Sequence, residues 1–227
     1  PDDEGRQSAL KETILKSGFP VYEDYKSPEH LAELLEQDLW EILDREFPSS
    51  DIPDSFVREN LKHEAYAQPL QRLYIGGDQY LDALDRALSE DKQWILIDGP
   101  SGAGKSALLS NWLNSVSDRE KDIEFHAHYL GATADATDPV FLIKRLIECI
   151  KRKTDSIDDV ASDPDELLDS LPTWLANASS WCEMQGKKFL FLIDALNSLS
   201  DRRDLRWFPR MLPRHIHLVT STLPGEV

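Results

Sequence analysis

Positive charge is scarce in this chain of 227 residues. It has 25 Lys and Arg against 42 Asp and Glu, a formal net charge of -17. Nucleic acids need a positive surface that releases counterions, and anionic lipids attract basic segments, so we expect neither a nucleic-acid nor a membrane partner. The acid is concentrated in residues 1–60, with 16 acidic and 6 basic side chains. We interpret this excess as a solvated helical face, with a docking surface as the alternative.

Cysteines and long apolar runs are also few. Cys149 and Cys182 are the two cysteines, too few for a disulfide framework or a metal cluster, which favours a reducing, cytoplasmic location. We expect both to be small buried hydrophobic residues. No apolar run reaches the ~20 residues of a membrane span, and no signal peptide is recognisable. Because the chain starts at Pro1 without an initiator methionine, we expect a fragment of a longer protein.

Short apolar runs alternate with helical patterns in the second half of the chain. The runs that predict strands are 94–98, 123–130, 189–193 and 216–220. The predicted helices are 105–116, one capped by Asp138-Pro139, and one from Ser162 that Pro172 is expected to break. Strands separated by helices predict an α/β fold with a mainly parallel sheet and helices on both faces.

The residues before these strands divide into two segments. Residues 1–50 carry one apolar helical stripe after the helix start at Ser27-Pro28, and we expect them to be the helical tail of an upstream domain. Prolines among polar residues in 51–73 predict a linker with one short helix. We expect the α/β core over 74–227.

A glycine-rich loop joins the first predicted strand to the next helix. Residues 99–106 match GxxxxGK[ST] in full. Glycines let the backbone wrap around phosphates, and N–H groups at a helix start attract their charge. We therefore expect ATP or GTP with Mg²⁺, with a plain strand-to-helix turn as the alternative. The residues predicted to contact the nucleotide are Gly99, Pro100, Ser101, Gly102, Ala103, Gly104, Lys105, Ser106 and Ala107.

The expected catalytic residues are Lys105, Asp194 and Asn197. Lys105 would reach the β- and γ-phosphates, while Ser106 and Asp194 would hold Mg²⁺, since Asp194 ends a buried parallel strand. Hydrolytic P-loop enzymes usually carry a second acid near the position of Asn197. An amide can bind a water molecule but cannot take its proton, so we expect slow hydrolysis.

Three further residues on predicted strands carry polar side chains. Ser221 lies among hydroxyl residues that end the last predicted strand and is a candidate γ-phosphate contact, with an ordinary strand-end hydroxyl as the alternative. His126 and His128 share one face of the second strand by period two. We favour packing over metal binding for them because no third ligand stands nearby.

Several stretches together resemble the STAND class of signalling P-loop NTPases, relatives of the NACHT and NB-ARC domains, and most closely its nephrocystin-like branch. The matching stretches are His63 to Ala65, Tyr74 to Gly76, Asp98 to Leu113, His128 to Ala132, Asp194 to Asn197 and Leu218 to Pro224. The resemblance implies a P-loop fold of the additional-strand type, truncated here before its fifth strand and lid. It also implies nucleotide contacts from Ile75 and Gly76, although Gly77 stands where this class usually has Arg.

The resemblance further implies a nucleotide-controlled switch in a multidomain signalling or defence protein. Bound ATP would organise self-association through the NTPase domain, and tetratricopeptide or WD repeats beyond this chain would sense a protein partner. One alternative is a scaffold that binds ATP or ADP without significant hydrolysis, which Asn197 favours. Another alternative is a small-molecule kinase. The lack of an arginine-rich lid in the sequence argues against it.

Overall fold

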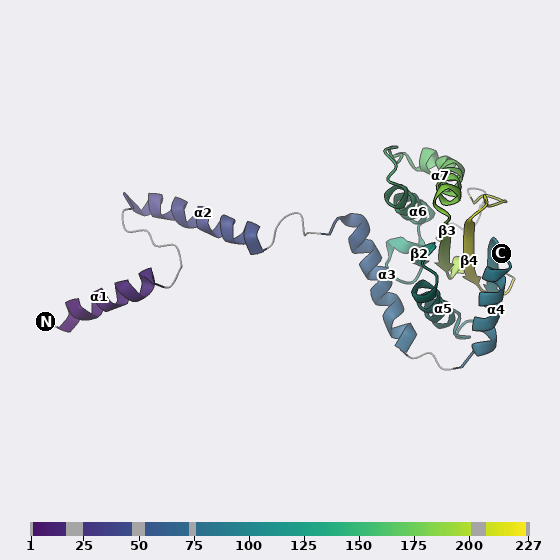
Figure 1. Cartoon of the computed structure of the whole chain (residues 1–227), viewed down its shortest axis with the longest axis horizontal. Helices are drawn as coiled ribbons and strands as arrows, with labels where there is room; N and C mark the ends of the chain where they lie inside the picture. The colour runs from purple at the N-terminus through teal and green to yellow at the C-terminus, as the bar shows by residue number, and fades with distance from the viewer. Residues whose placement is uncertain (1, 17–24, 47–52, 73–75, 201–207, 226–227) are drawn as a thin grey trace. The chain divides into compact units, whose positions relative to one another are not determined.

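The computed structural model describes residues 2–16, 25–46, 53–72, 76–200 and 208–225 (Figure 1). The chain forms two compact units, Pro1–Asp54 and Ser55–Val227. The first unit contains helices α1 (Asp2–Leu15) and α2 (Pro28–Glu46). In α2 the predicted start is confirmed, because the N–H of His30 donates to Ser27 Oγ at 3.2 Å. Its apolar stripe lies at the surface, with Leu39 59% exposed.

Residues 51–73 differ from the expected linker. The structure has an 18-residue helix here, α3 (Ser55–Arg72), with Pro69 inside its last turn. The helix belongs to the second unit and buries His63 and Ala67 inside it. Packing of these two residues stabilises a helix that the polar, proline-containing sequence concealed, because most helical stability in proteins comes from tertiary contacts.

Four parallel strands make the central sheet of the second unit, as predicted. They are β1 (Trp94–Asp98), β2 (Ile123–Tyr129), β3 (Lys188–Asp194) and β4 (Ile216–Thr222). Their order is β1-β4-β3-β2. Asp98 pairs with Thr222, and Tyr129 pairs with Asp194, so the carboxyl ends of the strands meet at one edge of the sheet.

Helices cover both faces of the sheet, which confirms the α/β prediction (Figure 1). The helices are α4 (Asp78–Ser89), α5 (Lys105–Arg119), α6 (Pro139–Thr154) and α7 (Pro164–Gln185). In β3, Phe189, Phe191 and Ile193 belong to the apolar core formed with α6 and α7. The alternate residues Leu190 and Leu192 belong to the core formed with α4 and α5. This alternation places β3 between two buried layers.

Helix α7 continues through Pro172, where a break was expected. Its start is well capped, since Asp163 Oδ1 accepts hydrogen bonds from the N–H groups of Asp165 and Glu166 at 3.0 and 3.1 Å. Leu171, beside the proline, is completely buried. The expected break was wrong because burial of the surrounding apolar residues outweighs the one helical hydrogen bond that proline removes.

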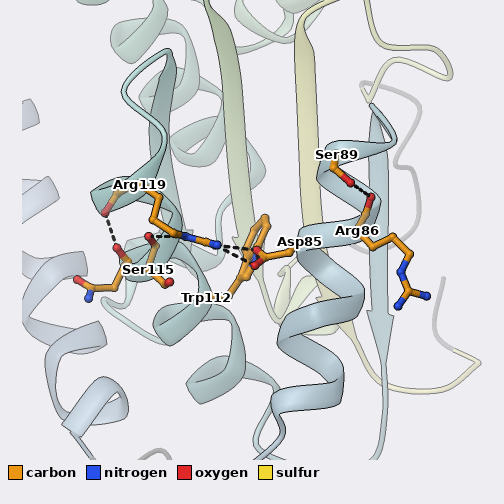
Figure 2. A network of polar contacts seen from close by, with 8 residues as sticks. Asp85, Arg86, Ser89, Trp112, Ser115 and Arg119 are labelled. Carbon is orange, nitrogen blue, oxygen red and sulfur yellow. Dashed lines mark hydrogen bonds and ion pairs between the residues drawn. The ribbon is translucent and has the colours of Figure 1, made fainter.

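A buried tryptophan connects α4 to α5 (Figure 2). The Nε1–H of Trp112, a residue only 1% exposed, donates to Asp85 Oδ1 at 2.8 Å. Arg119 Nη2 donates to both oxygens of the same carboxylate, each at 2.9 Å (Figure 2). Asp85 therefore holds both the middle and the end of α5, the helix that begins at the glycine-rich loop.

Both cysteines are buried, as expected. Burial raises the pKa of the Cys149 thiol to about 12 and that of Cys182 to about 11, which keeps both protonated at neutral pH. Within the described residues, none of the helices has the combination of length and apolarity that crossing a bilayer requires.

Candidate functional site

The glycine-rich loop, residues 99–106, leaves β1 after Asp98 and enters α5 at Lys105. Gly102 and Gly104 have φ angles of +78° and +85°, in the left-handed region that side chains disfavour. Gly104 is the N-cap of α5, and its carbonyl accepts from the N–H of Leu108 at 2.8 Å. Glycine at these positions thus permits the sharp turn into the helix.

Lys105 lies across this loop. Its Nζ donates to the carbonyl oxygens of Gly99 at 2.5 Å and of Pro100 at 2.9 Å. The predicted lysine and loop therefore come together at the start of α5, where helix N–H groups carry partial positive charge. Ser101 to Gly104 are exposed, and Ser106 is half-buried.

Asp194 ends β3 and is only 1% exposed. Its Oδ1 accepts a 2.6 Å hydrogen bond from the hydroxyl of Ser221 on β4. The same hydroxyl accepts from the N–H of Ala195 at 2.8 Å. Ala195 has a φ of +67°, unusual for a residue with a side chain, and this bond helps to hold it there. Ser221, expected as a phosphate contact, thus orients the carboxylate of Asp194.

The other predicted residues lie at the ends of neighbouring elements. Asn197 is half-buried in the short helix η3 (Leu196–Ser198), and its Nδ2 donates to Ser198 Oγ at 3.4 Å. Gly76 has a φ of +84° just before α4. Ile75 lies outside the described residues.

The loop and the carboxylate share one edge of the sheet. The loop follows the end of β1, Asp194 ends β3, and β4 runs between them. Two inter-strand spacings correspond to about 10 Å. A ligand of nucleotide size can contact both groups over that distance.

Sequence reasoning missed the role of His63. Its Nδ1 accepts from the N–H of Tyr129 at 3.0 Å, so α3 provides a partner for the outer edge of β2. Burial is the main reason that the pKa of His63 is lowered to about 2. The segment His63 to Ala65 stood out in the sequence, but no periodicity predicted this contact.

The two strand histidines pack inside the unit on one face, as period two predicted. Arg145 Nη1 lies 2.7 Å from His128 Nδ1, and because an arginine can only donate, Nδ1 is the acceptor. His128 Nε2–H therefore donates to the carbonyl of Ala136 at 2.7 Å. Burial lowers the pKa of His128 to about 3. His126 stacks on Phe56 of α3, with ring centroids 5.9 Å apart.

Comparison with known proteins finds low-identity relatives, and no family model matches the chain. A TPR repeat-containing protein of Dictyostelium discoideum is 25% identical over 96% of this chain and 17% of its own length. Nephrocystin-3 of Xenopus laevis is 26% identical over 90% of this chain and 17% of its own. Tetratricopeptide repeat protein 41 of Mus musculus is 20% identical over 96% of this chain and 20% of its own length. The chain thus spans a fifth or less of the relatives it matches, and their names indicate a nephrocystin-like relation.

Proposed function

We propose that this chain is a nucleotide-binding module that takes ATP or ADP with Mg²⁺ at the carboxyl edge of the sheet. The observation that carries the proposal is the pairing of the glycine-rich loop, with Lys105 at a helix start, and the buried carboxylate of Asp194, with one strand between them. The strand order, with β4 between the loop strand and the Asp194 strand, supports a P-loop fold of the additional-strand type.

The residues present fit a magnesium nucleotide. Gly102 and Gly104 allow the backbone to approach phosphates closely, and the start of α5 favours their negative charge. Lys105 would exchange its two loop carbonyls for phosphate oxygens. The hydroxyl of Ser106 and the carboxylate of Asp194 are hard oxygen donors of the kind Mg²⁺ prefers. The bound ion would neutralise phosphate charge and orient the terminal phosphate.

We further propose slow hydrolysis, as in a switch rather than a rapid enzyme. Asn197 follows Asp194 by three residues and offers an amide where a general base would be needed. In the full-length protein the module would self-associate and respond to a partner bound by repeats of the kind named in two relatives. A cytoplasmic scaffold without turnover is the second candidate, and Asn197 favours it as well.

A titration with a fluorescent ATP analogue, with and without Mg²⁺, tests nucleotide binding. Lys105→Ala should weaken binding by about 100-fold, equivalent to ~3 kcal/mol, since it removes a charged phosphate contact. Asp194→Asn should retain binding in EDTA but lose the gain that Mg²⁺ provides. Lys121→Ala makes the same charge change at an exposed lysine in the turn after α5 and should bind like the wild type. Unchanged affinity in both site variants would refute the site.

Single-turnover hydrolysis by the full-length protein separates the switch from the scaffold. A slow but measurable rate that rises in Asn197→Asp indicates a switch limited by its missing base. No turnover in either protein, with binding intact, indicates the scaffold.

A further inference from the structure

A polar groove with a volume of about 410 Å³ lies between α3, the second half of α5 and the outer edge of β2. Volumes of about 300–1,000 Å³ are typical of sites that hold a ligand. The groove is separate from the glycine-rich loop and Asp194, neither of which lines it. Its walls bring together a buried cation and an open strand edge.

The cation is Arg145 of α6, which lines the groove although it is only 3% exposed. Its Nη1 contacts His128 Nδ1 and its Nη2 donates to Asn60 Oδ1, both at 2.7 Å and both uncharged acceptors. Its Nε is buried and has no partner. Across the described residues no carboxylate forms an ion pair with it. A buried guanidinium without an ion-pair partner is unfavourable, and an anionic ligand in contact with it would relieve that cost.

Glu59 of α3 supplies a counter-charge only in part, because it forms no ion pair with Arg145. Glu59 acts on Arg145 electrostatically, but its Oε1 binds Lys62 and its Oε2 is buried without a partner. Two further buried nitrogens along the groove also lack partners, Nε2 of His63 and Nε2 of His126. The groove therefore has more unsatisfied polar groups than a closed structural contact would leave.

The strand edge belongs to β2, the outermost strand of the sheet on this side within the described residues. The N–H of Tyr129 points away from β3, because it donates to His63. Since main-chain groups alternate in direction along a strand, those of Phe125 and Ala127 point the same way. Both residues line the groove. An open edge of this kind pairs with an extended segment of another chain.

We propose that this groove binds an extended peptide with acidic side chains at alternate positions. The peptide main chain pairs with β2 at Phe125 and Ala127, and one carboxylate becomes the counter-charge of Arg145. Side chains of an added strand alternate between the two faces of the sheet, so every second one faces α6, which carries Arg145. A free carboxylate alone would satisfy the arginine but not the strand edge.

Fluorescence anisotropy on the full chain tests the proposal with labelled acetyl-Val-Glu-Val-Glu-Val-amide and a matched glutamine peptide. We expect the glutamate peptide to bind at least about tenfold more tightly, the value of one charge-assisted hydrogen bond. Equal affinity for the two peptides would overturn the role of Arg145. Displacement by free glutamate at the same carboxylate concentration would overturn the pairing with β2.

Two groove variants probe the charge. Arg145→Met should abolish the preference for glutamate, provided that its far-ultraviolet spectrum is native. Glu64→Gln removes an exposed acid from the groove wall and should tighten binding of the glutamate peptide, by up to about fivefold, without touching the core. Glu183→Gln, the same change at an exposed position on α7, should have no effect. If Glu64→Gln leaves the peptide affinity as unchanged as Glu183→Gln does, the groove is not the site. This outcome is informative even if Arg145→Met does not fold.

A third variant probes the strand edge. Ala127→Pro removes an N–H that points away from the sheet and keeps the hydrogen bonds between β2 and β3. Edge strands tolerate proline at such a position. The variant should weaken binding of both peptides while nucleotide affinity is retained. Unaltered peptide affinity in this variant would exclude the added strand.

Discussion

The hydroxyl of Ser221 joins the end of β4 to the carboxylate that ends β3, donating to Asp194 Oδ1 at 2.6 Å. It also accepts from the N–H of Ala195, which has a left-handed φ. One side chain thus orients the buried acid and the turn that follows it. The direction of the carboxylate depends on a residue 27 positions away in the sequence.

The first prediction concerns this bond. Ser221→Ala leaves a buried carboxylate oxygen and a main-chain N–H without their partner, so the free energy of unfolding should fall by about 1–3 kcal/mol. Urea denaturation at neutral pH measures it. Ser89→Ala, which removes an exposed hydroxyl bound to a helix carbonyl, is the control and should change stability little. A loss no larger than that of the control would contradict the assigned role.

The second prediction compares two glycines of the same loop. Gly104 has a φ of +85°, so Gly104→Ala should destabilise the chain by about 1–2 kcal/mol through backbone strain. At Gly99 φ is not in that region, and an added Cβ would have its nearest neighbour, Lys105 Cδ, at 3.7 Å, an ordinary contact. Gly99→Ala should therefore fold with near wild-type stability. Thermal melting without nucleotide distinguishes the pair, and equal melting temperatures would contradict the argument.

The third prediction concerns the stability of the chain at acidic pH. Burial lowers the pKa values of His63, His126 and His128 in the folded chain. The unfolded chain takes up protons near pH 6.5 that the folded chain excludes. The free energy of unfolding therefore has its full value above about pH 6.5. As the pH drops below 6.5, it decreases by about 1.4 kcal/mol per pH unit for each histidine.

Replacing one of these histidines tests that slope. His126→Phe keeps a ring against Phe56 and removes one titrating group together with an unpartnered nitrogen. Its stability should fall less steeply between pH 6.5 and 5, by about 1.4 kcal/mol per pH unit. Urea denaturation at several pH values gives the slope. Parallel curves for wild type and variant would show that His126 does not contribute.

The fourth prediction concerns the contact in Figure 2. Asp85→Ala leaves the indole N–H of Trp112, a residue only 1% exposed, without an acceptor and should destabilise the chain by about 1–3 kcal/mol. Asp82→Ala, at an exposed position of α4, is the matched control. Combining Asp85→Ala with Trp112→Phe separates the hydrogen bond from the ion pair with Arg119. Additive losses in that cycle would show that the bond to Trp112 contributes nothing.

Local patterns predicted the elements that depend on short-range rules. All four strands lie within two residues of where the sequence placed them. The signal is clearest in β3, because a strand buried on both faces needs an unbroken apolar segment. Asp138 was recognised as a helix cap from its neighbour Pro139, and its side chain accepts from the N–H of Val140. The glycine-rich loop and Asp194 were likewise recognisable. Their nucleotide and magnesium chemistry remains a proposal.

What the patterns missed depends on distant contacts. Helix α3 and the passage of α7 through Pro172 are stabilised by burial against the sheet, which outweighs weak local propensity. Gly102 and Gly104 could be read from the sequence as a turn, because glycine's backbone freedom is a local property. The hydrogen bonds of Ser221, His63 and Arg145 could not be predicted, because only packing of β4, α3 and α6 brings these side chains to their partners. The sequence by itself determined the strands, the loop and the acid, whereas the tertiary structure decided how the acid is oriented and where the polar groove lies.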